Sequence, residues 1–105
     1  MAIRVGINGF GRIGRTVFRI ISQNPDRFEL CGINLRTIEA GSQHLIVNGK
    51  PVRIFSESDP ANIEWASCGA EYIIESTGAF NTTAASSAHM KGGAKKIIIT
   101  APAKD

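Results

Sequence analysis

The sequence has few of the residues that mark specialised classes of protein. Its 105 residues include only two cysteines and two histidines, and neither Cys31 nor Cys68 has the spacing of a metal ligand. These counts fit a reducing, cytoplasmic compartment. No apolar run approaches the roughly 20 residues that span a bilayer, and no signal peptide is visible. We therefore expect no membrane partner.

A strong excess of charge of one sign is also missing. Lys and Arg total 12 and Asp and Glu total 9, which gives a net charge of +3, and the basic residues are scattered along the chain. Clustered basic residues mark nucleic-acid surfaces, so direct nucleic-acid binding is not indicated. A hydrophobic content of 43% with 20% charged residues is typical of a folded protein. The length predicts one small domain or part of a larger one.

Neither cysteine is predicted to be a reactive thiol. Cys31 lies inside the apolar run of residues 28–33, where a buried and inert thiol is expected. Cys68 lies in a loop-like segment, and neither histidine is its neighbour in the sequence. Because a reactive cysteine needs an electropositive setting, we interpret Cys68 as a free thiol that is exposed or half-buried.

The most informative segment present is the glycine-spaced turn GFGRIG at residues 9–14. It follows a strand-like apolar run and precedes a helix-like pattern, which is the setting of a dinucleotide-binding turn. In such a turn Gly9 allows a tight bend, Gly11 allows close approach of a pyrophosphate, and Gly14 allows the helix to pack on the strand. The N–H groups and positive dipole end of the following helix favour phosphates.

The remaining patterns alternate between strand and helix. Strands are predicted at about residues 3–8, 28–34, 72–76 and 95–100, and helices at about 12–23 and 82–90. A hairpin is predicted where Asn48 and Gly49 separate residues 45–47 from 52–55. A short helix begins near Asp59 and Pro60, with Trp65 anchoring it. The order predicts an α/β fold: a Rossmann-like, doubly wound, mainly parallel sheet with a right-handed βαβ unit and an appended β-hairpin.

Four of these strands end in residues that suit a ligand. In open parallel sheets ligands bind at the carboxyl ends of the strands, which here hold residues 8–9, 33–36, 76–78 and 100–102. The alternative is that strand ends are simply rich in turn-forming residues. Elsewhere the sequence shows no nucleophile–base pair, and we interpret Glu75 as a backbone-bonding residue rather than a general acid.

The second strand end leaves the choice of cofactor open. The acidic residue that accepts hydrogen bonds from the adenosine ribose belongs about 20 positions after the turn, and here that position holds Leu35, followed by Arg36. Leu35 weakens recognition of an unphosphorylated ribose, and it removes the negative charge that repels a 2′-phosphate. Arg36 is either the partner of such a phosphate, which favours NADP or dual use, or a solvated surface residue.

Three segments, residues 5–15, 69–78 and 89–96, resemble the phosphorylating glyceraldehyde-3-phosphate dehydrogenases in the same order. The resemblance implies that Arg12 and Ile13 contact the cofactor's pyrophosphate, and that Asn8, Asn34, Thr77, Gly78 and Thr100 line the adenosine and nicotinamide path. With the turn and the second strand end, the predicted cofactor-binding residues are Asn8, Gly9, Phe10, Gly11, Arg12, Ile13, Gly14, Asn34, Leu35, Arg36, Thr77, Gly78 and Thr100. No catalytic or metal-binding residue is predicted.

The chain departs from that family in four places. Leu35 replaces the ribose-binding aspartate, and Ser58 replaces an arginine near the adenine. A crossover helix and its loop, about 30 residues judged against the family, are missing after Arg36, because the connection is shorter than the roughly 10–12 residues that a crossover needs. The sequence also stops before the family's catalytic cysteine and histidine, without which no acyl-enzyme forms.

We therefore expect residues 1–105 to be a partial NAD(P)-binding domain without its catalytic domain. The family is an oxidoreductase of glycolysis that oxidises and phosphorylates an aldehyde while passing a hydride to NAD(P). This chain alone is predicted to bind NAD or NADP weakly and to be inactive. One alternative is a non-catalytic interaction module that self-associates through surface left uncovered by the missing helix. Another is one half of a split enzyme that is completed by a separate catalytic chain.

Overall fold

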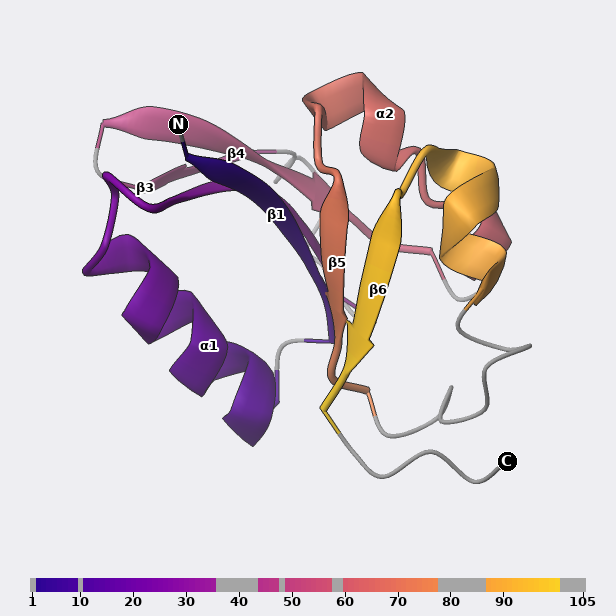
Figure 1. The fold of residues 1–105 in the computed structure, drawn as a ribbon, viewed down its shortest axis with the longest axis horizontal. Helices are drawn as coiled ribbons and strands as arrows, with labels where there is room; N and C mark the ends of the chain where they lie inside the picture. Colours follow the sequence, from indigo (N-terminus) through magenta and orange to yellow (C-terminus); the bar gives the residue numbers. More distant parts are fainter. Residues whose placement is uncertain are drawn as a thin grey trace.

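The computed structural model describes residues 2–9, 11–35, 44–47, 49–57, 60–77 and 87–100. A six-stranded sheet in the order β3-β4-β2-β1-β5-β6 forms its centre (Figure 1). The strands are β1 (Ile3–Asn8), β2 (Phe28–Asn34), β3 (His44–Val47), β4 (Lys50–Phe55), β5 (Tyr72–Glu75) and β6 (Lys96–Ile99). Every pair is parallel except β3 with β4. This arrangement confirms the predicted Rossmann-like fold.

The first β-α-β unit builds one face of the sheet. Helix α1 (Arg12–Ser22) places Val17, Phe18 and Ile21 against the apolar side chains of β1 and β2. Residues three and four apart share one side of a helix, so this spacing buries a single stripe. The helix stops just before Pro25, as the sequence predicted, because proline disfavours helical backbone before it.

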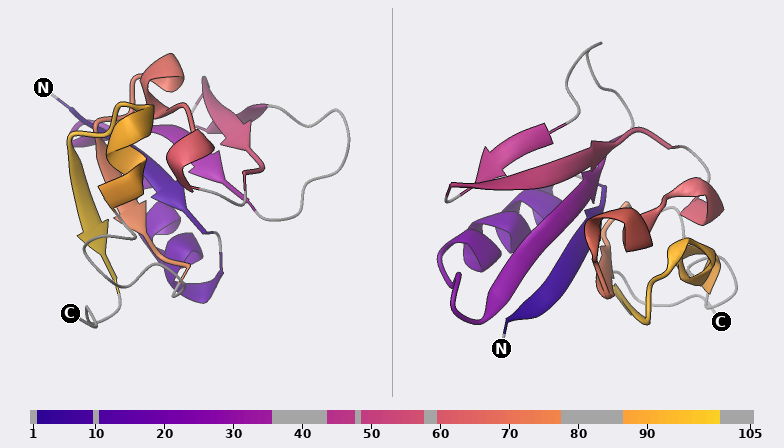
Figure 2. Two further views of the ribbon diagram at one scale, coloured as in Figure 1. Left: turned by 90° about the vertical axis from the view of Figure 1, so that its right-hand side faces the viewer. Right: turned by 90° about the horizontal axis from the view of Figure 1, so that it is seen from above.

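The predicted hairpin is present, and its second strand lies inside the sheet. Strands β3 and β4 pair antiparallel, with Leu45 opposite Val52, and Gly49 has a positive φ of 79°. Asn48, the other turn residue of the prediction, lies outside the described residues. Strand β4 also pairs parallel with β2, so the hairpin extends the sheet and β3 is its edge (Figure 2).

Short helical segments cover the opposite face of the sheet (Figure 2). They are η1 (Pro60–Asn62), α2 (Trp65–Cys68) and η2 (Ser87–Gly92), of which η1 and η2 are 3₁₀ helices. Trp65 is fully buried there, which confirms its predicted anchoring role. Among the described residues, no helix is long and apolar enough to cross a membrane.

Two sequence predictions on this face need correction. The loop-like segment around Cys68 is helix α2, which ends at Gly69 with the left-handed φ of 81° that favours glycine. Within the predicted helix at 82–90, the described part from Ser87 is 3₁₀ helix, and residues 82–86 lie outside the described residues. Gly93 follows this segment with a left-handed φ of 108°, which favours glycine.

Candidate cofactor site

The glycine turn between β1 and α1 has the geometry that its spacing predicted. Gly9 has φ 92°, and a Cβ atom there would lie 2.7 Å from the Thr77 side chain. A Cβ atom on Gly14 would fall on the Gly9 carbonyl oxygen, closer than real Cβ atoms approach, and within 2.9 Å of the Ser76 hydroxyl. The first and third glycines are therefore required by the fold of the chain itself.

Gly11 is different, because a Cβ atom there would meet no atom of another described residue within 4 Å. Its backbone is extended, with φ −85°, so the fold does not need glycine at this position. Gly11 caps the N-terminus of α1, where no side chain caps the helix and no acidic residue lies in the first turn. The second glycine thus leaves open space beside the N–H groups of a helix end, which suits an anionic group.

Strand β5 fastens this turn from the side. The backbone N–H of Ser76 donates to the Asn8 carbonyl at 2.9 Å. The Ser76 hydroxyl lies 2.6 Å from the Gly9 carbonyl oxygen and 3.0 Å from that of Asn8. The glycine turn is therefore held by the residue that follows β5 as well as by its own glycines.

The two asparagines predicted for the cofactor path are buried and hydrogen bonded to protein groups. Asn34 donates from Nδ2 to Oδ1 of Asn8 at 2.8 Å and to the Glu57 carbonyl at 2.9 Å. Its own Oδ1 accepts from the Glu57 N–H at 2.9 Å. Their side chains tie the carboxyl ends of β1 and β2 together, so the structure gives them a role in shaping this edge.

The other predicted residues divide into three groups. Arg12 and Ile13 are exposed in the first turn of α1. The Leu35 side chain packs against the apolar cluster under α1. The Thr100 hydroxyl donates to the Glu75 carbonyl oxygen at 3.2 Å. Phe10, Arg36 and Gly78 lie outside the described residues, as does Ser58.

A buried polar chain beneath this edge was missed by the sequence analysis. The indole N–H of Trp65 donates to Nδ1 of His89 at 3.1 Å, and Nε2 of His89 lies 2.6 Å from Oε1 of Glu75. Oε1 also accepts from Nδ2 of Asn8 at 2.7 Å. Oε2 accepts from the N–H and the hydroxyl of Thr77, at 3.1 and 2.6 Å. Glu75 thus bonds to backbone, as predicted, and to a wider network.

The ionisation of Glu75 follows from these contacts. Burial raises the pKa of its carboxyl, but hydrogen bonds from His89, Thr77 and Asn8 outweigh that effect and hold the pKa below the ordinary value of 4.5. A folded-state pKa below the unfolded value means that ionised Glu75 stabilises the fold above the unfolded pKa. That contribution is lost as the pH falls through the folded value.

The two thiols lie at the other edge of the sheet. A surface cavity of about 410 Å³ is lined by Cys31 and Cys68 together with Glu29, Lys50 and Arg53, near the amino ends of β2 and β4. Burial raises the pKa of Cys31 to about 12 and also raises the pKa of Cys68. Both thiols therefore stay protonated and are poor nucleophiles, which agrees with the prediction for Cys31.

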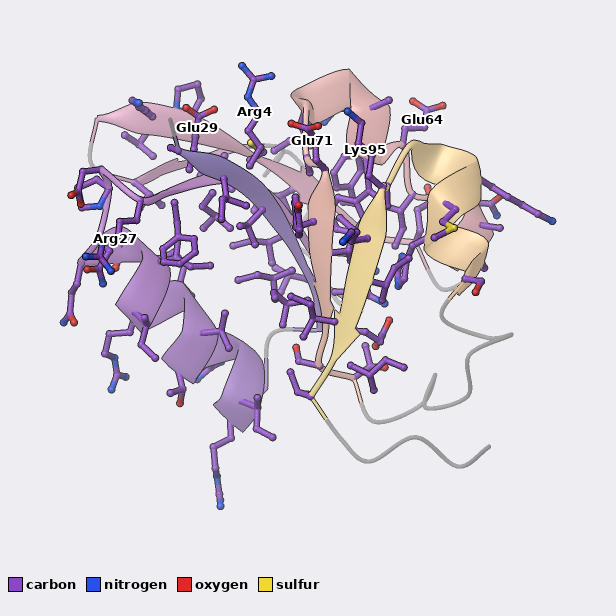
Figure 3. All side chains as sticks on the ribbon, viewed as in Figure 1. Arg4, Arg27, Glu29, Glu64, Glu71 and Lys95 are labelled. Carbon is purple, nitrogen blue, oxygen red and sulfur yellow. The ribbon has the colours of Figure 1, made fainter. Side chains whose placement is uncertain are left out.

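Charged side chains gather at this amino-terminal edge, away from the glycine turn (Figure 3). Glu29 lies 3.8 Å from Arg4 and 3.7 Å from Lys50, and Glu71 lies 2.7 Å from Lys95. These pairs are substantially exposed, so each contributes little to stability. Within the described part of the chain, no three His, Cys, Asp or Glu side chains are grouped to hold a metal ion.

Comparisons with known proteins place the chain among the glyceraldehyde-3-phosphate dehydrogenases. The family model described as "Glyceraldehyde 3-phosphate dehydrogenase, NAD binding domain" matches residues 3–42 and 35–83. The chain is 46% identical over 127 residues to a glyceraldehyde-3-phosphate dehydrogenase of Podospora anserina and 48% identical over 127 residues to one of Coccidioides immitis. Each alignment covers 100% of this chain and 37% of the relative. The chain therefore spans little more than a third of those proteins.

Proposed function

Because the chain belongs to the glyceraldehyde-3-phosphate dehydrogenase family, matched through its NAD-binding domain, we propose that it binds NAD at the carboxyl edge of its sheet. The pyrophosphate lies on the turn from Gly9 to Gly14, against the N-terminus of α1. Thr77 and Thr100 border the same edge from β5 and β6. The cofactor supplies hydride acceptance when bound, and these residues hold and orient it.

The open space at Gly11 is the observation that carries this proposal. Gly9 and Gly14 are crowded by protein atoms, whereas the described part of the chain leaves the space beside Gly11 open. A glycine that the fold does not need, at the uncapped N-terminus of a helix, is explained by a ligand that approaches the backbone closely.

Replacing Gly11 by alanine tests the proposal directly. We expect the Gly11→Ala chain to have a free energy of unfolding within about 0.5 kcal/mol of the wild type, because the added methyl group clashes with no other described residue. We expect its NAD dissociation constant, measured by calorimetry, to rise about tenfold or more, because the methyl group occupies the space of the pyrophosphate.

Ile20→Ala is the matched control, since Ile20 is an exposed residue near the other end of the same helix. It should leave NAD binding unchanged. If the Gly11→Ala chain bound NAD as tightly as the wild type, the pyrophosphate could not lie at this turn. A wild-type chain that gives no heat at millimolar NAD would contradict the proposal as a whole.

We further propose that the chain discriminates little between NAD and NADP. Leu35 stands at the end of β2 with its side chain turned into the apolar cluster under α1, so it offers no acceptor to a ribose hydroxyl. It also places no negative charge there to repel a 2′-phosphate. Arg36 follows it in the sequence.

Leu35→Asp should restore the missing preference. We expect NAD to bind about tenfold more tightly, because hydrogen bonds to a carboxylate contribute roughly 1.5–3 kcal/mol, and NADP to bind more weakly through charge repulsion. Leu35→Asn is the control, because asparagine has the size of aspartate without its charge, and this variant should not reject NADP. Paired calorimetric titrations with the two cofactors measure both effects, and equal changes for NAD and NADP would contradict the assignment of Leu35 to the ribose.

We propose that these 105 residues bind the cofactor without dehydrogenase activity. Their two thiols have raised pKa values and lie near the amino-terminal edge, so neither serves as the nucleophile that an acyl-enzyme needs. Turnover then depends on parts of the relatives that this chain does not span, or on a separate catalytic chain.

The self-association alternative is supported by one observation. Strand β6 is an edge of the sheet, and Ile98 on it is 50% exposed. An exposed apolar edge strand is a template for pairing with another chain. Sedimentation separates the two functions, because a stable oligomer that is indifferent to NAD and NADP would favour an interaction module.

A further inference from the structure

We propose that Glu75 and His89 are positioning residues of the cofactor edge, by which we mean the carboxyl edge of the sheet where NAD is proposed to bind. Trp65 orients His89, His89 orients the Glu75 carboxylate, and this carboxylate fixes Asn8 and Thr77 in place. The inference rests on the proposed NAD site for its functional meaning. It goes beyond that site by assigning a role to a buried network that does not itself face the ligand.

Trp65 determines which atoms donate and which accept at one end of this hydrogen-bond network. An indole N–H only donates, so Nδ1 of His89, 3.1 Å away, must be the acceptor and carries no proton. The proton of a neutral imidazole is then on Nε2, which donates to Oε1 of Glu75 at 2.6 Å. A proton on Nδ1 would place two N–H groups against each other, so this contact selects the tautomer with its proton on Nε2.

Backbone atoms determine which atoms donate and which accept at the other end of the network. The N–H and the carbonyl of Glu57 fix the amide of Asn34, whose Nδ2 donates to Oδ1 of Asn8. Asn8 must therefore turn its Nδ2 toward Glu75, where it donates at 2.7 Å. Both ends of the chain of hydrogen bonds thus present donors to the same carboxyl group.

Among the described residues, Glu75 consequently accepts four hydrogen bonds and donates none. Oε1 accepts from Asn8 and His89, and Oε2 accepts from the N–H and hydroxyl of Thr77. Only an ionised carboxylate satisfies this arrangement, because an amide or a protonated acid would place a hydrogen against a donor. His89 is the ionisable side chain in contact with Glu75 in the described part of the chain.

The groups that Glu75 holds belong to the cofactor edge. Asn8 precedes Gly9 of the turn, and Thr77 is exposed at the end of β5, whereas Glu75 is only 1% exposed. Between them Ser76 binds the Gly9 carbonyl. The buried Glu75 carboxylate thus links β5 to the glycine turn, and Trp65 orients this carboxylate through His89.

Glu75→Gln is the decisive variant, with Glu71→Gln as the matched control. Glu71 is a half-exposed carboxylate that lies just before the same strand and pairs with Lys95. We expect Glu75→Gln to raise the NAD dissociation constant about tenfold, and Glu71→Gln to leave it unchanged. In NMR spectra Glu75→Gln should shift the Thr77 amide and the indole N–H of Trp65, the only tryptophan of the chain.

A folded Glu75→Gln chain with wild-type NAD affinity and an unmoved Thr77 amide would overturn the proposal. Should this variant not fold, His89→Leu removes one donor and leaves the carboxylate. A threefold or greater loss of NAD affinity with a displaced Thr77 amide then supports positioning, and wild-type values overturn it. The imidazole ¹⁵N signals of the unaltered chain at neutral pH must show a proton on Nε2 only, and any other state would also overturn it.

These readouts distinguish the two proposals. If the wild-type chain binds no NAD, the proposed function fails. Positioning is then judged in the cofactor-free chain, where Glu75→Gln must shift the Thr77 amide and Glu71→Gln must not.

Discussion

Replacing Gly14 by alanine is expected to lower the free energy of unfolding by up to about 2 kcal/mol. The added Cβ atom would meet the Gly9 carbonyl oxygen and would lie 2.9 Å from the Ser76 hydroxyl. That carbonyl cannot retreat freely, because the Ser76 hydroxyl and the Asn34 carbonyl hold Gly9 in place. Overpacking of this kind costs about 1–3 kcal/mol or more, and the better helix propensity of alanine offsets only about 1 kcal/mol.

Urea unfolding measures the effect, and Gly11→Ala is its control. The two substitutions are identical and lie three residues apart in one turn, yet the structure predicts that only Gly14→Ala lowers stability. Gly14→Ala should lower the unfolding midpoint and disturb NAD binding through the displaced turn. Gly11→Ala should change binding alone. Equal midpoints for the two variants would show that the close packing at Gly14 is wrong.

Local sequence patterns were sufficient to predict the glycine turn, the parallel sheet, α1 and the hairpin. The glycine spacing at 9–14, the apolar runs of the strands and the turn around Gly49 each depend on neighbours a few residues away. The structure confirms the parallel sheet, α1 and the hairpin from these signals. The helix predicted at 82–90 was less accurate, because its described part is 3₁₀ helix packed against η1.

The network under the cofactor edge was not predictable in the same way. Glu75 and Asn8 are 67 positions apart, and Trp65 and His89 are 24 apart. Their contacts exist only after β1 and β5 pair and η2 packs against the sheet. The available signal was a carboxylate at the end of an apolar strand, which indicates a buried partner without naming it. Asn8 and Asn34 show the same limit, because their residue types suggested a ligand before the fold paired them.

Trp65 is where the second large effect is expected. Its side chain is fully buried and packs edge-on against Phe55, with ring centroids 5.4 Å apart. It also fills the space over Gly6, where a Cβ atom would come within 2.5 Å of the indole ring. Trp65→Ala should therefore cost about 3–5 kcal/mol, which is a large share of the roughly 5–15 kcal/mol that stabilises a typical domain.

Trp65→Phe separates the packing of this residue from its hydrogen bond. The phenyl ring keeps most of the apolar contact with Phe55 but lacks the N–H that His89 accepts, so a buried acceptor is left unsatisfied at a cost of about 1–3 kcal/mol. Urea unfolding followed by circular dichroism should rank the chains wild type, Trp65→Phe, Trp65→Ala in falling stability. If Trp65→Phe matched the wild type, the indole N–H would contribute nothing. The orientation of His89 toward Glu75 would then need another explanation, because the protonated nitrogen of His89 is derived from that one hydrogen bond.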